Sequence, residues 1–269
     1  MQRSSLISIL ARIGSIAAVI LIILTIAWVI LLIHPSPPSA EASAVERLAF
    51  IEQNEHWQTI SFAVAALMAI AYIPVWLGIG ATIVPVRQTL GMIAVALGVM
   101  FSAVLVVGYW TQLATVQNLL QLLDTNTQAA IAMAGAFDFS GNFWTASYGI
   151  VIAAFVLWGL TTLTIFAGMV DSRYRPAQIT GALFGAAGLL ALVGAVGFAA
   201  GIGFLGHGIL LSGVLFVPAL SGTVIVLHRV ASGADPAQIV TGNRRSAPDE
   251  SSVPVMTPAD AQPGSDGRT

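Results

Sequence analysis

The chain has 269 residues, of which 57% are hydrophobic and 8% are charged, whereas about a quarter of the residues of a soluble domain are charged. This composition excludes an ordinary soluble domain and indicates an integral membrane protein. The chain has no cysteine, which excludes disulfides, thiol nucleophiles, iron–sulfur clusters and thiolate zinc sites. It also has no lysine, which excludes lysine Schiff-base chemistry and a P-loop lysine. The net charge of -2 is uninformative, because the side on which each charge lies matters more than their sum.

The N-terminal part predicts a retained first membrane span. Residues 1–12 are short and polar, and 13–33 is an apolar stretch of 21 residues without a charge. This stretch exceeds the roughly 7–15 residues of a signal-peptide core, and about 20 helical residues cross the hydrocarbon core of a bilayer. The prolines of 34–38 end the helix, since proline cannot donate its backbone hydrogen bond.

Five further apolar runs predict five further spans, at about 59–84, 90–110, 144–170, 179–200 and 209–227. We therefore expect an all-α, polytopic bundle of six transmembrane helices in a membrane domain covering 13–231. Residues 232–269 are rich in Ser, Pro, Asp, Gly and Gln, a composition that buries too little apolar surface to offset its ordering entropy. We expect this tail to be disordered.

Two segments between the spans predict an external helical cap. Residues 41–58 have a mixed apolar and acidic pattern and run into the second span. In the longer segment 111–143, apolar residues recur every three or four positions up to a polar break at 124–127, and 128–137 forms a second short helix. We expect the apolar faces to lie on the lipid or the bundle rather than on a partner.

Arginine counting predicts the orientation. With the N-terminus inside, nine of the ten basic residues are internal and only Arg47 is external. Basic residues are retained on the cytoplasmic side, so both termini are predicted to be cytoplasmic in a plasma membrane. The lipid bilayer is the expected partner, and no nucleic-acid partner is expected.

The predicted spans contain no charged residue. Because intramembrane charges usually mark ion paths or proton relays, their absence argues against a proton- or ion-driven pump. A carrier of apolar or neutral solutes remains open, using the hydroxyls of Ser61, Tyr72, Thr82, Ser102, Thr161, Thr162, Thr164, Ser212 and Ser221. We favour the simpler interpretation that these hydroxyls bond to their own or a neighbouring helix.

A set of titratable residues is predicted at the external face, formed by His34, Glu52, Glu55, His56, Asp138 and His207. Glu52 and His56 are four residues apart and share a helix face. Such a set is compatible with a divalent metal or with acid–base chemistry at the headgroup level, but we favour solvated interfacial residues. We assign no cofactor, metal or catalytic residue, and we do not expect a membrane-buried haem, since the histidines lie near the membrane edges.

The fifth span is rich in glycine. Gly181 and Gly185 are four residues apart, as are Gly197 and Gly201, and this small-xxx-small pattern lets helix backbones approach closely. We expect close packing inside the bundle rather than a ligand groove, and a homo-oligomer or membrane partner held by these glycines stays open.

The order of the parts, with Arg87 in one turn and Arg173-Tyr-Arg-Pro176 in another, resembles that of a family of small six-span bacterial membrane proteins of unknown function. The resemblance covers about 13–227 and implies a bacterial plasma-membrane location, without an activity or site residues.

Two functional hypotheses follow. The first is a non-enzymatic binding, carrier or scaffold protein for a lipid-like or neutral solute or for a partner, because the predicted interior is uncharged and rich in glycine. The second is a membrane enzyme or metal-binding protein with its site at the external face.

Overall fold

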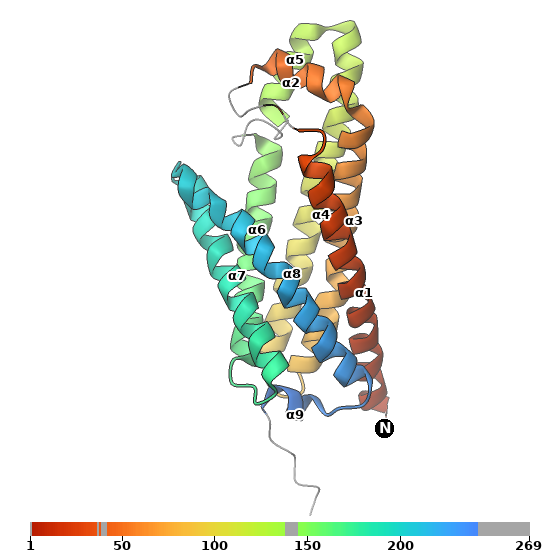
Figure 1. Cartoon of the computed structure of the whole chain (residues 1–269), viewed down its shortest axis with the longest axis vertical. Coiled ribbons are helices and arrows are strands. Elements are labelled where there is room, and N and C mark those ends of the chain that lie inside the picture. Colours follow the sequence, from red (N-terminus) through yellow and green to blue (C-terminus); the bar gives the residue numbers. More distant parts are fainter. Residues whose placement is uncertain (1, 37, 39–41, 138–144, 242–269) are drawn as a thin grey trace, which may run out of the picture.

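A computed structural model describes residues 2–36, 38, 42–137 and 145–241. Within these ranges the chain is helical and has no strand. The helices are α1 (Gln2–Ile33), α2 (Ala44–Gln53), α3 (Glu55–Ile83), α4 (Gln88–Thr125), α5 (Thr127–Phe137), α6 (Ala146–Met169), α7 (Arg175–Ala199), α8 (Gly203–Ala231) and α9 (Pro236–Val240) (Figure 1).

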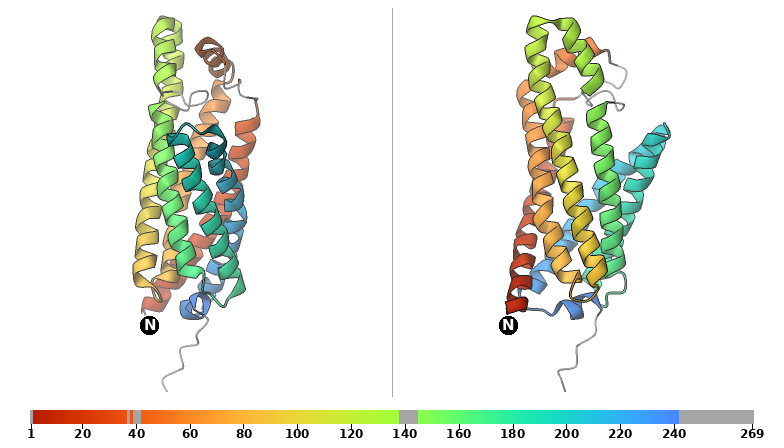
Figure 2. Two further views of the ribbon diagram at one scale, coloured as in Figure 1. Left: turned by 90° about the vertical axis from the view of Figure 1, so that its left-hand side faces the viewer. Right: turned by 180° about the vertical axis from the view of Figure 1, so that it is seen from behind.

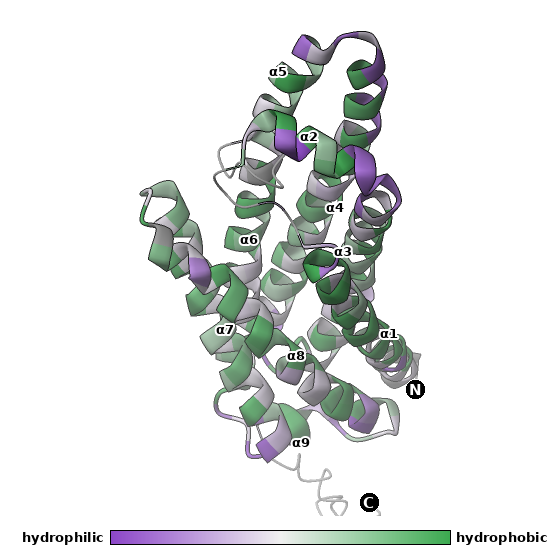
Figure 3. Ribbon diagram, turned by 45° about the horizontal axis from the view of Figure 1, so that its top comes forward, coloured by the Kyte–Doolittle hydropathy of each residue, from purple (hydrophilic) through white to green (hydrophobic). Residues whose placement is uncertain are grey.

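Six of these helices, α1, α3, α4, α6, α7 and α8, are long and apolar enough to cross a membrane. The predicted all-α bundle of six spans is therefore confirmed, and the chain is an integral membrane protein. Hydrophilic residues gather at the two ends of the bundle, with an apolar zone between them (Figure 3).

The six long helices form a closed ring. Each packs on the next, in the order α1, α3, α4, α6, α7 and α8, and α8 returns to α1. Because each span shares an interface with two neighbours, one side of each helix faces the ring interior, and most of the remaining surface is apolar and exposed.

The two ends of the ring differ in composition. What we call the arginine end carries the first turns of α1, α9 and the turns with Arg87, Arg173 and Arg175. The cap end carries α2 and α5, with Arg47 in α2. The described chain therefore begins and ends at the same end of the bundle (Figure 1).

The helices at the cap differ from the prediction in their boundaries. The third span does not stop at residue 110, because α4 continues without a break to Thr125. Its outer turns keep an apolar stripe, with Val116 and Leu119 buried, and α5 packs back on α4. On the other side, the predicted helix at 41–58 is broken at Asn54, so that α2 is separate from α3.

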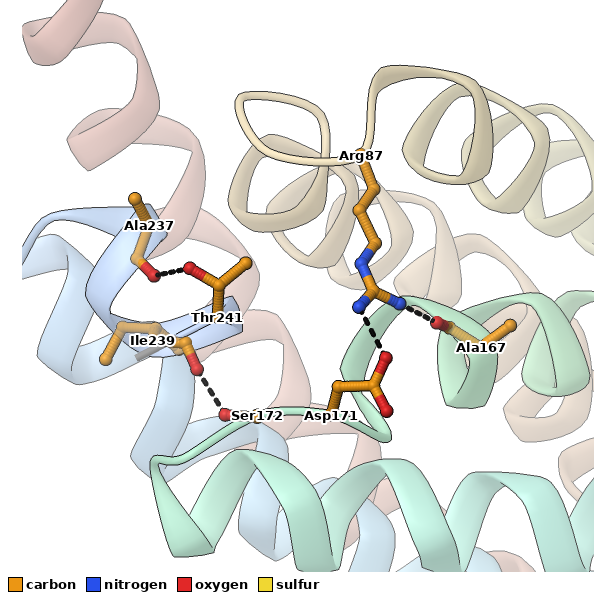
Figure 4. A network of polar contacts seen from close by, with 7 residues as sticks. All are labelled: Arg87, Ala167, Asp171, Ser172, Ala237, Ile239 and Thr241. Atoms are coloured by element: carbon orange, nitrogen blue, oxygen red, sulfur yellow. Dashed lines mark hydrogen bonds and ion pairs between the residues drawn. The ribbon is translucent and has the colours of Figure 1, made fainter. Parts of the chain in front are cut away.

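The arginine end is tied together by polar contacts between segments far apart in sequence (Figure 4). Arg87, between α3 and α4, donates to the carbonyl oxygen of Ala167 in α6 and pairs with Asp171, at 2.7 Å from its Oδ2. Ser172 donates to the carbonyl oxygen of Ile239 in α9.

Helix α9 corrects the expected start of the disordered tail. Residues 236–240 were predicted to belong to it, yet they form a short helix capped by the Asp235 carboxylate. Ile239 and Val240 are buried, and α9 packs on α3 and α8. The few apolar residues of α9 therefore dock this helix on the bundle, although the surrounding segment is polar. The prediction for 242–269 lies outside the described residues, as does the predicted start of the fourth span at residue 144.

Helix α8 crosses the bundle obliquely. Near the arginine end it lies on α1, where Ser8 donates to the carbonyl oxygen of Ala231 at 2.8 Å and Ser15 to that of Val224 at 3.4 Å. Towards the cap, the α7–α8 hairpin leans away from α1 (Figures 1 and 2). In agreement, no described residue of α1 after Leu21 is buried. The ring is therefore tight at the arginine end and looser towards the cap.

Candidate functional site: unpaired donors in the bundle interior

An aromatic cluster fills the middle of the ring. It consists of Tyr72 and Trp76 of α3, Phe101 of α4, Trp158 of α6, Phe184 of α7 and Phe216 of α8. Tyr72 stacks on Trp76 with ring centroids 5.6 Å apart, and Phe216 bridges Tyr72 at 5.4 Å and Trp158 at 5.3 Å. These six side chains come from five helices, α3, α4, α6, α7 and α8, so the cluster joins five of the six spans.

Small residues make room for these rings. A methyl group at Gly98 of α4 would lie 2.5 Å from Cγ of Trp76, so the indole occupies the place where a side chain would be. Gly14 of α1 and Gly78 of α3 also meet closely, because a methyl group at Gly14 would lie 3.0 Å from the Gly78 Cα. Close backbone approach of this kind is typical of membrane helix interfaces.

Most hydroxyls in the spans are bonded within their own helix. Six of the nine singled out in the sequence, Thr82, Ser102, Thr161, Thr162, Thr164 and Ser221, donate to the carbonyl oxygen four residues earlier. This agrees with the simpler of the two interpretations for those six. Their O–H groups cannot donate to a ligand without losing that bond.

Ser212 behaves differently. It is fully buried, and its Oγ has no hydrogen-bond partner among the described residues. It lies on α8 one turn towards the cap from Phe216, whose ring contacts Trp158. The Nε1 of Trp158 is also buried without a partner there, as is that of Trp76. An unpaired buried donor costs about 1–3 kcal/mol, so the middle of the bundle holds three costly donors in and beside one aromatic cluster.

A second group of buried polar side chains lies nearer the cap. Gly108 of α4 is packed against Val151 of α6, and one turn further out the same antiparallel faces carry Gln112 and Ser147, both fully buried. The Oγ of Ser147 has no hydrogen-bond partner among the described residues. The interior is thus uncharged but not purely apolar on the cap side of the aromatic cluster.

Trp28 of α1 belongs to the same region. Its ring meets the edge of Tyr109 of α4 at 6.0 Å, and its Nε1 is buried with no partner among the described residues. Trp28 lies in the part of α1 from which α8 diverges. No sequence pattern distinguishes Trp28, Trp76 or Trp158 as functional residues, because tryptophans on a buried helix face are also typical of ordinary packing.

The residues of the predicted external set that the structure describes lie on several elements. His34 follows α1 and meets the edge of the Trp57 ring at 6.1 Å, Glu52 is in α2, and Glu55 and His56 begin α3. His207 is near the start of α8, at the tip of the hairpin that leans away from α1 (Figure 2). No group of three or more His, Cys, Asp or Glu side chains within the described ranges is placed to hold a metal ion. Asp138 lies outside those ranges.

The predicted glycines of α7 are used inside the chain. A methyl group added at Gly181 would lie 2.9 Å from Met169 of α6, and one added at Gly185 would lie 2.8 Å from Phe166 of α6. One added at Gly197 would lie 2.2 Å from Leu205 of α8. These three faces are therefore occupied by neighbouring helices of the same chain.

Gly201 differs from the predicted packing role. It has φ +69°, and a methyl group there would have nothing within 4 Å. Its N–H donates to Phe198, and the N–H of Ile202 donates to Gly197 at 2.8 Å, which is the Schellman arrangement that ends a helix. Gly201 therefore terminates α7, where a left-handed conformation favours glycine.

Comparisons with known proteins give no match: no family model, no curated protein and no solved structure is significantly similar to this chain.

Proposed function

We propose that the protein is a non-enzymatic binding or carrier protein for a neutral, lipid-like solute that carries hydrogen-bond acceptors, such as carbonyl or ether oxygens. The observation that carries the proposal is the set of buried donors without partners among the described residues, in particular Ser212 and Trp158. The ligand oxygen would accept from these donors, and its apolar part would lie on the aromatic cluster.

The charge of the interior favours a neutral ligand. Buried ions need a partner of opposite charge, and the buried polar residues described in the spans are Ser, Thr, Gln and Tyr. A neutral ligand needs no such partner. Membrane lipids with ester or ether groups, and quinone-like rings, share this chemistry.

The divergence of α8 from α1 supports an entry route from the bilayer. Gly206 and Gly213 lie on the face of α8 that packs on α1 near the arginine end. A methyl group added at either glycine would have nothing within 4 Å. A ligand entering from the lipid between these two helices would reach Ser212 next to Gly213. The bacterial plasma membrane, with both termini cytoplasmic, is the location we propose.

Native mass spectrometry of the full chain released gently from membranes tests this proposal. We expect one neutral lipid-like molecule per chain, and we expect the double variant Ser212→Ala, Trp158→Phe to lower its occupancy roughly tenfold or more, since each net hydrogen bond contributes about 0.5–1.5 kcal/mol. The phenyl ring of the variant retains most of the aromatic packing.

Ser221→Ala is the matched control, because Ser221 is on the same helix and already donates to Val217 at 3.1 Å. Its occupancy should equal that of the wild type. A protein that carries no bound molecule, or equal losses for both serines, would contradict the proposal. A metal ion bound at unit stoichiometry would instead favour the alternative site at the external face.

A further inference from the structure

A groove lies at the arginine end, far from the aromatic cluster. It has a volume of about 670 Å³ and opens between Tyr174, just before α7, and the last turns of α8 with the segment leading into α9. Its polar lining includes His228, Arg229 and Gln238. The function proposed above makes no use of these residues.

The groove carries an exposed cation that is held in place. The guanidinium carbon of Arg229 lies 5.8 Å from the centre of the Tyr174 ring, a distance typical of a cation–π contact. No ion pair joins Arg229 to a carboxylate in the described part of the chain. Asp235 lies close in sequence, but its carboxylate caps α9 through the N–H of Ala237 at 2.9 Å.

The wall of the groove nearer the membrane is apolar. Val224 and Ile225 line it, and Ile225 is 52% exposed. A ligand that matches this groove has an anionic group that pairs with Arg229 and an apolar part that packs on the apolar wall of α8. Guanidinium groups bind phosphate oxygens with strong, charge-assisted hydrogen bonds, and Gln238 adds a neutral hydrogen-bonding group.

We propose that this groove binds the phosphate group of an anionic phospholipid from the leaflet at the arginine end, with the lipid chains lying along Ile225. The phosphate chemistry is shared by free phosphate, but the apolar wall favours the lipid. This site is independent of the proposed function, because Arg229 lies roughly five turns further along α8 than Ser212 and the site takes a charged ligand.

The test uses the full chain in detergent, titrated separately with short-chain phosphatidylglycerol, short-chain phosphatidylcholine and inorganic phosphate, with bound molecules counted by native mass spectrometry. We expect phosphatidylglycerol to bind at least tenfold more tightly than phosphatidylcholine, and Arg229→Gln to weaken it tenfold or more. Arg173→Gln is the matched control, because Arg173 is also an exposed arginine at this end but does not line the groove. It should leave the affinity within twofold.

Gln238→Leu is a second variant that keeps every charge, and it should weaken phosphatidylglycerol binding several-fold. If Arg229→Gln and Arg173→Gln weakened phosphatidylglycerol binding equally, the lipid would be attracted by the general positive charge of this end, and the proposed site would be overturned. Tight binding of inorganic phosphate without a preference for phosphatidylglycerol would overturn the lipid assignment. Absence of any preference between the two lipids would overturn the proposal as a whole.

Discussion

At the scale of single residues, the absence of a side chain decides how closely the helices approach. The α7–α8 hairpin is the clearest case, because a methyl group at Gly208 would lie 2.5 Å from the carbonyl oxygen of Leu190 and 2.9 Å from the backbone nitrogen of Gly194. These atoms belong to a helix backbone and cannot move aside cheaply. Gly206, one half-turn away on the same helix, has nothing within 4 Å.

Gly206 and Gly208 should therefore respond differently to substitution by alanine. Gly208→Ala should lower the free energy of unfolding by about 1–3 kcal/mol, since the added methyl overpacks the interface. Gly206→Ala should leave it unchanged or raise it by up to about 1 kcal/mol, because alanine is the better helix former. Unfolding of each variant in mixed detergent micelles measures the difference, and equal effects at both positions would contradict this account of the hairpin.

At the scale of elements, the helices outside the membrane depend on local hydrogen bonds for their ends. Helix α2 begins with a capping box: the backbone N–H and Oγ of Ser43 donate to Oε2 of Glu46 at 2.7 and 2.9 Å, and the Glu46 N–H donates back to Ser43 at 3.3 Å. Hydrogen bonds from the Ser43 backbone, and then from its side chain, lower the pKa of Glu46.

The capping box makes the order of α2 dependent on pH. Because the folded pKa of Glu46 lies below its ordinary value of 4.5, the stabilisation is fully present above that ordinary value and is lost as the pH falls through the lowered pKa. Hydrogen exchange of the α2 amides, corrected for the intrinsic pH dependence, should show this loss of protection.

Glu46→Gln should weaken that dependence, since the amide does not titrate. Glu52→Gln, on the same helix but outside the capping box, should preserve it. Protection in the wild type that stays constant through the acid range would show that packing, and not the cap, holds α2.

At the scale of the whole molecule, the positive charge is concentrated at one end. Arg12, Arg87, Arg173, Arg175 and Arg229 lie in the half of the bundle that includes the arginine end, while Arg47 lies at the cap. Because basic residues are retained on the cytoplasmic side of a membrane, we propose on this basis that the cap faces outward.

Helix α4 offers a direct measurement of that orientation, because the chain has no cysteine of its own. Gln88 and Gln121 are exposed residues near the arginine end and the cap end of this one helix. A membrane-impermeant maleimide should label Gln121→Cys in intact cells within minutes, and Gln88→Cys only after the membrane is permeabilised. The reverse pattern would place the cap inside.

The sequence by itself determined the class of the protein and its span count, because an apolar run of about 20 residues without charge satisfies its environment within a bilayer whatever its neighbours are. The grouping of the arginines at one end could likewise be predicted from the order of spans and turns along the chain. The helix ends were predicted less accurately. The polar residues near 124–127 indicated the break there, but the sequence did not show that the third span continues without a break into the outer part of α4.

Only the tertiary structure decided which polar groups are paired. Ser212 and Ser221 lie in the same helix and look alike in sequence, but the first is buried without a described partner and the second is bonded to its own helix. The same holds for Gly197, which packs on α8, and Gly201, which ends α7. Docking of α9 depends on Ser172 and on helices far away in the chain. Each of these outcomes depends on contacts between segments distant in sequence, and local composition and periodicity carry no information about such contacts.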